Sequence, residues 1–146
     1  MVIGRPQACR AVAVGVLAAS ILIAGCGLFD SDVRWEDGRF VVVWIDTPSS
    51  AHLAYKMKGD TSTRVVGACV FAVASNARYI TLLQATDGRA ADARHFVVDK
   101  MAYSPERAPA KGIRGPLSKP AFDVLRGRLQ LPLPREVMPA RLCSPP

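Results

Sequence analysis

From residue 35 onward, apolar residues recur at the spacing of β-strands. The run from Phe40 to Ile45 is β-branched and aromatic throughout, which is typical of a largely buried strand. The next run alternates, so that Leu53, Tyr55 and Met57 share one face. Turn residues, such as the Asp-Gly pair at 37–38, separate the runs. The pattern predicts strands over 40–45, 52–57, 64–74, 78–83 and 95–98, and Ile113 is a candidate for a further short strand.

A helix is predicted after Ser118, where the period of the apolar residues changes. Ser118 is a good N-cap, and Pro120 falls in the first turn, where a missing N–H costs nothing. Leu117 can pack on Phe122 as a hydrophobic staple. Prolines 132 and 134 limit the helix to about three turns. We expect its apolar residues to lie on the sheet, with Arg126 and Arg128 facing water; these apolar residues are Phe122, Leu125 and Leu129.

Two polar stretches, 87–92 and 104–112, are predicted as loops because they combine small, charged and turn-forming residues. The whole pattern predicts an α+β fold, an antiparallel β-meander of about five strands with one C-terminal helix packed on it. We expect residues 35–146 to form a single globular domain, because a chain of this length can build one core.

The N-terminal segment has the layout of a secretory signal. Arg5 and Arg10 precede an apolar stretch over 11–23, and no acidic residue occurs before Asp30. A membrane-spanning helix needs roughly 20 apolar residues, so this shorter stretch indicates a removable signal.

The end of that signal, Ile23-Ala24-Gly25-Cys26, resembles the lipobox of bacterial lipoproteins. The resemblance implies that residues 1–25 are cleaved, that Cys26 receives diacylglycerol and further acyl chains such as palmitate, and that 26–34 is a tether. It also implies a periplasm-facing protein in the cell envelope, on the outer membrane where there is one, since Gly27 is not the aspartate that retains lipoproteins on the inner membrane. The alternative is an ordinary signal peptide, with Cys26 incidental.

Charge is unevenly distributed along a chain whose net charge is +7. Residues 100–146 contain nine basic and three acidic residues. This half could meet a protein partner or an anionic polymer, and the candidate partner-binding residues are Arg114, Lys119, Arg126 and Arg128. The alternative is a solvated surface, because the charges are spread singly. Nucleic acid is not an expected partner of an exported protein.

Two cysteines remain once Cys9 has left with the signal and Cys26 is acylated. Cys69 and Cys143 form an even pair in an oxidising compartment, which predicts a disulfide that pins the proline-rich tail. The alternative is two free thiols, with Cys69 buried as a small apolar residue.

Several motifs in the second half resemble those of a group of small uncharacterised bacterial proteins, many of them lipoproteins or prophage-like. They are Asn76 to Ile80, Ile113-Arg114-Gly115-Pro116-Leu117 and the helix with Phe122, Leu125 and Arg126. The motifs are built from a turn, a cap and a staple, so the resemblance implies a fold and no activity.

Candidate catalytic or metal-binding groups are few. His52 and His95 lack the spacing of a zinc site, so we expect both on strand surfaces, with no metal or cofactor. Asp92 and Asp99 are a weak candidate for paired carboxylates, and Trp35 for a sugar platform. We therefore expect a non-enzymatic, membrane-anchored envelope lipoprotein that binds a protein partner, in one version as an immunity-type protein against an imported toxin. The alternative is a cell-wall-associated structural lipoprotein.

Overall fold

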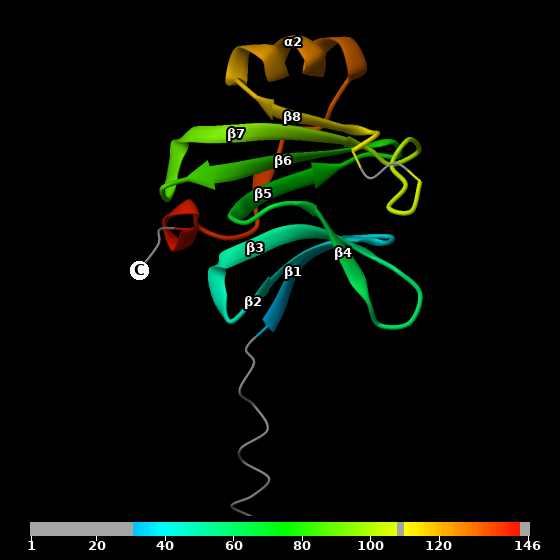
Figure 1. Cartoon of the computed structure of the whole chain (residues 1–146). Helices are drawn as coiled ribbons and strands as arrows, with labels where there is room; N and C mark the ends of the chain where they lie inside the picture. The colour runs from blue at the N-terminus through cyan, green and yellow to red at the C-terminus, as the bar shows by residue number, and fades with distance from the viewer. Residues whose placement is uncertain (1–30, 108–109, 144–146) are drawn as a thin grey trace, which may run out of the picture. The chain divides into compact units, whose positions relative to one another are not determined.

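In the computed structural model, which describes residues 31–107 and 110–143, the first half of the chain forms a four-stranded antiparallel sheet (Figure 1). Its strands follow one another in sequence order: β1 (Ser31–Asp37), β2 (Phe40–Ile45), β3 (Thr47–Lys56) and β4 (Ser62–Val66). Gly38, at φ 59°, forms the tight turn between β1 and β2, as the Asp-Gly pair predicts.

The second half forms a five-stranded antiparallel sheet in the order β8-β7-β6-β5-β9. Four of its strands again follow the chain, and only β9 crosses over to pair with β5. The elements are β5 (Val70–Ser75), β6 (Tyr79–Thr86), β7 (Arg89–Asp99), β8 (Ile113–Leu117), helix α2 (Lys119–Leu129), β9 (Arg135–Glu136) and the 3-10 turn η1 (Ala140–Cys143).

The two sheets and the helix make three layers. Between the sheets, Val42 and Leu53 of the first sheet pack with Ile80, Leu82 and Val98 of the second in one buried cluster. The opposite face of the second sheet is covered by α2, which lies above β7 and β8 in Figure 1. The α+β class is therefore confirmed, as is the packing of the helix on a sheet.

The expected meander of about five strands in one sheet is wrong, since the described residues contain nine strands in two sheets. The predicted strand over 64–74 is in fact two strands, β4 and β5. Between them the chain passes from one sheet to the other, and Cys69 there adopts φ 68°, a value outside the β region. A change of sheet leaves the apolar periodicity almost intact, so the pattern alone does not reveal it.

Strand β1 begins at Ser31, within the segment 26–34 that the sequence predicts as a tether. Ser31, Asp32 and Val33 pair with β2, and Arg34 lies at a bulge of the same strand, so residues 31–34 belong to the first sheet and not to a linker. The signal and Cys26 lie outside the described residues.

The predicted loop over 87–92 is also wrong. Asp87 and Gly88 both have positive φ, 55° and 71°, and form a two-residue hairpin turn. Strand β7 then starts directly at Arg89, so its first half consists of polar and small residues.

Candidate functional site

The junction of β8 and α2 is fixed by the capping residues that the sequence predicts. Ser118 is extended, and its Oγ accepts a hydrogen bond from Ala121 N at 3.4 Å. Pro120 occupies the first turn. Leu117 and Phe122 pack in the same apolar cluster, which also contains Val97 of β7. The chain therefore leaves the sheet at Leu117 and turns at once into the helix.

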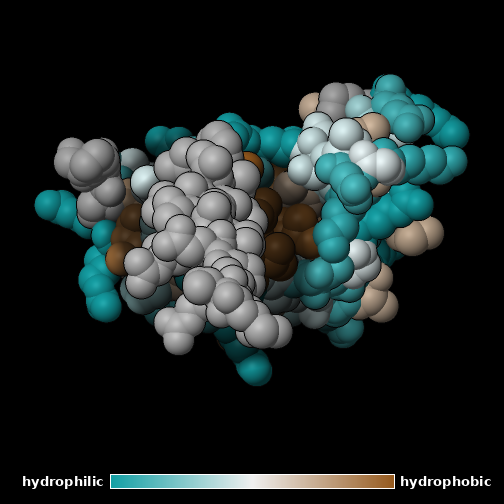
Figure 2. All heavy atoms as spheres, turned by 90° about the horizontal axis from the view of Figure 1, so that it is seen from below, coloured by the Kyte–Doolittle hydropathy of each residue, from teal (hydrophilic) through white to brown (hydrophobic). Residues whose placement is uncertain are grey.

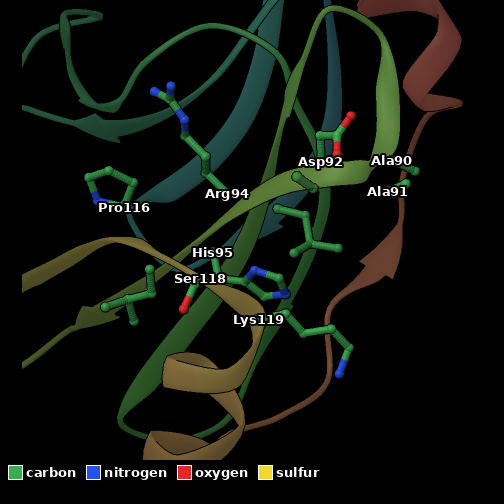
Figure 3. Close-up of a pocket in the computed structure, with 11 residues that line it drawn as sticks. Ala90, Ala91, Asp92, Arg94, His95, Pro116, Ser118 and Lys119 are labelled. Atoms are coloured by element: carbon green, nitrogen blue, oxygen red, sulfur yellow. The ribbon is translucent and has the colours of Figure 1, made fainter.

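A groove of about 630 Å³ opens beside this junction. Figure 3 shows its two sides, the first half of β7 and the segment that runs from β8 into α2. From β7 it is lined by Ala90, Ala91, Asp92, Ala93, Arg94 and His95, and from the other side by Pro116, Leu117, Ser118 and Lys119. The lining combines small apolar side chains with charged groups.

His95 is half-buried at the floor of this groove. Its ring lies against Phe122, with the centroids 4.7 Å apart. Nδ1 is buried and has no hydrogen-bond partner in the part of the chain that the structure describes. Burial lowers the pKa of His95, Asp123 acts in the opposite direction, and Lys119 adds to the decrease. At neutral pH the imidazole ring of His95 is therefore uncharged.

Neither histidine lies on a strand surface as expected. His52 is only 7% exposed, and its Nδ1 lies 2.9 Å from the carbonyl oxygen of Ser50. His95 is partly covered by the helix. The strand pattern shows which face a residue occupies, but it does not show that another layer covers that face.

The four candidate partner-binding residues do not form one patch. Lys119 pairs with Asp123 at 2.6 Å, and Asp123 also lies close enough to Arg126 and His95 to interact electrostatically. Arg126 is partly buried, contrary to the expectation that it faces water, and its Nε has no partner among residues 31–107 and 110–143. Arg128 follows Lys119 by nine residues, which puts it on the opposite side of the helix.

Arg114, the fourth of these residues, is exposed on β8. Lys119 alone of the four lines the groove, where Arg94 joins it. Sequence reasoning missed Ala90 and Ala91 because residues 87–92 are predicted as a loop, and it missed Ala93 and Arg94 because the next predicted strand begins only at residue 95. The Asp-Gly pair at 87–88 was the signal that could have placed them on a strand.

Cys69 and Cys143 are brought together at the end of the second sheet. The Cys69 thiol donates a hydrogen bond to the carbonyl oxygen of Cys143 at 3.1 Å, and the two side chains also interact. Both are thiols in this structure. Burial raises the pKa of Cys143 to about 12, so it is a protonated group. The pairing in space agrees with the sequence, and the covalent bond stays a prediction.

The other candidate groups have structural contacts. Asp99 lies at the far end of β7 from Asp92 and accepts hydrogen bonds from Arg78 Nη2 at 2.9 Å and from Met101 N at 3.0 Å. Trp35 packs against the core between the sheets. Within the described ranges, no group of three or more metal-binding side chains forms, and no helix has the length and apolarity to cross a bilayer.

Comparison of the chain with protein-family models, with curated proteins and with solved structures gave no match. The resemblances seen in the sequence therefore stay expectations, and the function has to be argued from the residues and their geometry.

Proposed function

We propose that this chain is an envelope lipoprotein, anchored through Cys26, whose folded domain is a non-enzymatic module that binds a protein partner. An immunity-type protein is one specific form of this function. The proposal combines the lipobox-like end of the signal with the position of β1, the first described strand.

The short spacing between Cys26 and β1 supports this proposal most directly. Ser31 is the first residue of β1 and follows Cys26 by five positions. Five extended residues span at most about 18 Å. An acyl chain on Cys26 would thus hold the domain within about 18 Å of the lipid surface, with β1 nearest to it.

The layer order supports one choice of surface for a partner of the tethered domain. β1 belongs to the first sheet, whereas α2 and the groove lie on the far side of the second sheet (Figure 1). A domain tethered at β1 would present α2 and β8 away from the bilayer. The basic residues of this layer, Arg114, Lys119 and Arg128, would therefore meet a periplasmic macromolecule more readily than lipid head groups.

The surface near the tether has a different character. Figure 2 is a view from the side of the first sheet, and apolar surface is visible there among hydrophilic margins. Val33 and Ile45 are 52% and 47% exposed, and Ile45 pairs with Ser31, where the tether enters. Apolar side chains at this place suit a position next to lipid.

Anchoring is tested by replacing the acceptor of the lipid. The wild-type protein should fractionate with membranes, and its mass should correspond to residues 26–146 plus acyl chains. Cys26→Ser should remain unprocessed or lose the lipid. A wild-type product with residue 26 unmodified, or with residues 1–25 still attached, would contradict the envelope assignment.

Partner binding is tested on the mature protein in detergent. After cross-linking in the envelope, one protein should be recovered reproducibly and should rebind once purified. Arg114→Glu combined with Arg128→Glu should weaken rebinding, whereas Arg64→Glu, exposed on β4 of the other sheet, should not. Salt-sensitive sedimentation with peptidoglycan and no protein partner would instead favour the cell-wall alternative.

A further inference from the structure

The face of the first sheet that points away from the second sheet has an apolar end. Val42 and Trp44 of β2 point inward, since they belong to the buried clusters between the sheets. Side chains alternate along a strand, so Val43 and Ile45 point outward. Val33 of β1 lies opposite Val43 in the register of the two strands and therefore shares the outer face. These three outward side chains, Val33, Val43 and Ile45, form what we call the apolar patch.

The patch is accessible, and its backbone does not depend on water at the most exposed turn. Val33 and Ile45 are 52% and 47% exposed. The N–H of Ile45 donates to Ser50 Oγ at 2.8 Å, and the same hydroxyl donates to the Ile45 carbonyl oxygen at 2.6 Å. Ile45 can therefore enter an apolar phase without the loss of these backbone hydrogen bonds, which is the usual cost of such a transfer.

The other end of the same face is charged. Glu36 of β1 lies opposite Val41 of β2 and pairs with Lys56 of β3 at 2.6 Å. Arg64 of β4 lies opposite Ala54 of β3. The two apolar residues at this end, Val41 and Ala54, are only 4% and 0% exposed. The exposed apolar side chains of this face therefore lie at the beginning of β1.

The chain enters the sheet at this apolar end. Ser31, the first residue of β1, lies opposite Ile45, and Cys26 precedes Ser31 by five residues. A lipid on Cys26 would therefore lie within about 18 Å of Ser31. Strand β1 has seven residues and is about 20 Å long, so its charged end lies farther from such an anchor. An anchor on Cys26 would thus bring the patch to the membrane before the charged end.

Charge near the patch gives no reason to expect attraction to acidic head groups. Arg34 pairs with Asp32 at 3.1 Å. Asp46, which follows Ile45, has no ion-pair partner in the part of the chain that the structure describes. The charges beside the patch are thus two acidic groups and one basic group. Such a surface suits the border of the hydrocarbon layer better than a layer of anionic head groups.

We propose that the apolar patch inserts into the head-group border of the membrane that holds Cys26, as a second and non-covalent contact of the domain with lipid. This inference rests on the proposed function, since the acyl anchor brings the patch to the bilayer. The driving force is the removal of apolar surface from water. The contact holds the domain in one orientation, with the charged end of the outer face in water.

The probe for the patch is a vesicle of phosphatidylcholine with brominated acyl chains, which quench tryptophan fluorescence at short range. The mature, acylated protein is reconstituted in these vesicles. Ile45→Trp labels the patch, and Val124→Trp on α2, at a residue 66% exposed, is the matched control. After subtraction of the wild-type signal, the quenched fraction should be roughly threefold or more larger for Ile45→Trp, because only this tryptophan meets lipid. Equal quenched fractions in the two variants would overturn the proposal.

A second change tests whether the neighbouring apolar side chain helps to hold the patch in lipid. Val33→Ser in the Ile45→Trp protein should reduce the quenched fraction by roughly twofold or more, because it removes apolar area from the contact. Val124→Ser in the same protein should leave it unchanged. Circular dichroism verifies that both proteins remain folded. An unchanged quenched fraction with Val33→Ser would show that the introduced tryptophan enters lipid by itself, which also overturns the patch.

Lipid composition separates apolar contact from charge attraction. Replacement of part of the neutral lipid by brominated phosphatidylglycerol should leave the quenched fraction of Ile45→Trp unchanged, because the charges beside the patch are not mainly basic. An increase that high salt reverses would show that basic side chains hold the domain at the membrane, and it would contradict the assignment to the apolar patch.

Failure of the patch is distinguishable from failure of the proposed function. If Cys26 is acylated and an envelope partner binds, but Ile45→Trp is not quenched, the proposed function stands and the patch is excluded. If residue 26 proves unmodified, the proposed anchor is wrong. Quenching by vesicles added to that protein would then show a lipid-binding patch that acts alone, and no quenching would overturn the patch as well.

Discussion

At the scale of single residues, Gly115 determines how β8 lies against β7. It adopts φ 147°, and a Cβ at this position would collide with Phe96 Cδ1 and come within 2.9 Å of the His95 carbonyl oxygen. The tight approach lets the strand end at the floor of the groove. The packing of β8 on β7 therefore requires glycine at position 115. This requirement explains the glycine in the motif from Ile113 to Leu117.

Replacement of this glycine should be costly. Gly115→Ala combines a strained backbone with overpacking, so we expect the free energy of unfolding to fall by about 2–4 kcal/mol. Gly127→Ala is the control, because nothing lies within 4 Å of its Cβ position and alanine favours the helix by about 0.5–1 kcal/mol. Urea unfolding measures the free energy of unfolding of both variants. A value for Gly115→Ala equal to or above that of the wild type would refute the assignment of strain to Gly115.

His95 should make stability depend on pH. Burial lowers its pKa in the folded state, so below the ordinary value near 6.5 the unfolded chain binds more protons than the folded one. The free energy of unfolding should then fall from pH 7.5 to pH 5, and less steeply in His95→Gln. Denaturant titrations at the two pH values give the slopes. Parallel slopes for the two proteins would show that His95 titrates normally.

At the scale of elements, α2 was predictable and the first half of β7 was not. Ser118, Pro120 and the apolar spacing are local signals that specify a helix start, and the described helix begins and ends within the predicted three turns. Residues 89–94 have few apolar side chains, and all of them except Ala93 are exposed. A strand without a buried face has no apolar periodicity to detect, although the Asp87-Gly88 pair predicts the hairpin turn before it.

The attachment of α2 depends on one side chain. Phe122 is the only residue of the helix that is fully buried, whereas Val124 is 66% exposed. Phe122→Ala should lower the free energy of unfolding by about 3–5 kcal/mol, because it leaves a cavity above Val97. Val124→Ala should stay within about 0.5 kcal/mol of wild type. Thermal unfolding by circular dichroism compares the two, and similar melting temperatures would contradict this packing.

At the scale of the whole molecule, the C-terminal tail closes the end of the two-sheet core. Val137 N and Met138 N donate to the carbonyl oxygen of Phe71 at 2.9 and 3.3 Å. η1 then packs Ala140 and Cys143 into a cluster with Trp44 of the first sheet and Phe71 of the second. The tail thus connects both sheets, and its last described residue is Cys143 beside Cys69.

Oxidation of this pair should stabilise the whole domain. In the chain-entropy model, a bridge across the long loop from Cys69 to Cys143 is worth about 4–5 kcal/mol. Protein from an oxidising compartment should contain no reactive thiol at these positions, and a reductant should lower its melting temperature. Cys143→Ser should be insensitive to the reductant. Two alkylatable thiols in the native protein would refute the disulfide.

The sequence by itself determined the local features of the fold: the turn at Gly38, the cap at Ser118 and the strand character of Phe40 to Ile45. These depend on neighbouring residues, so short-range pattern is sufficient. The division into two sheets, the burial of His52 and His95 and the meeting of Cys69 with Cys143 were decided only by tertiary structure.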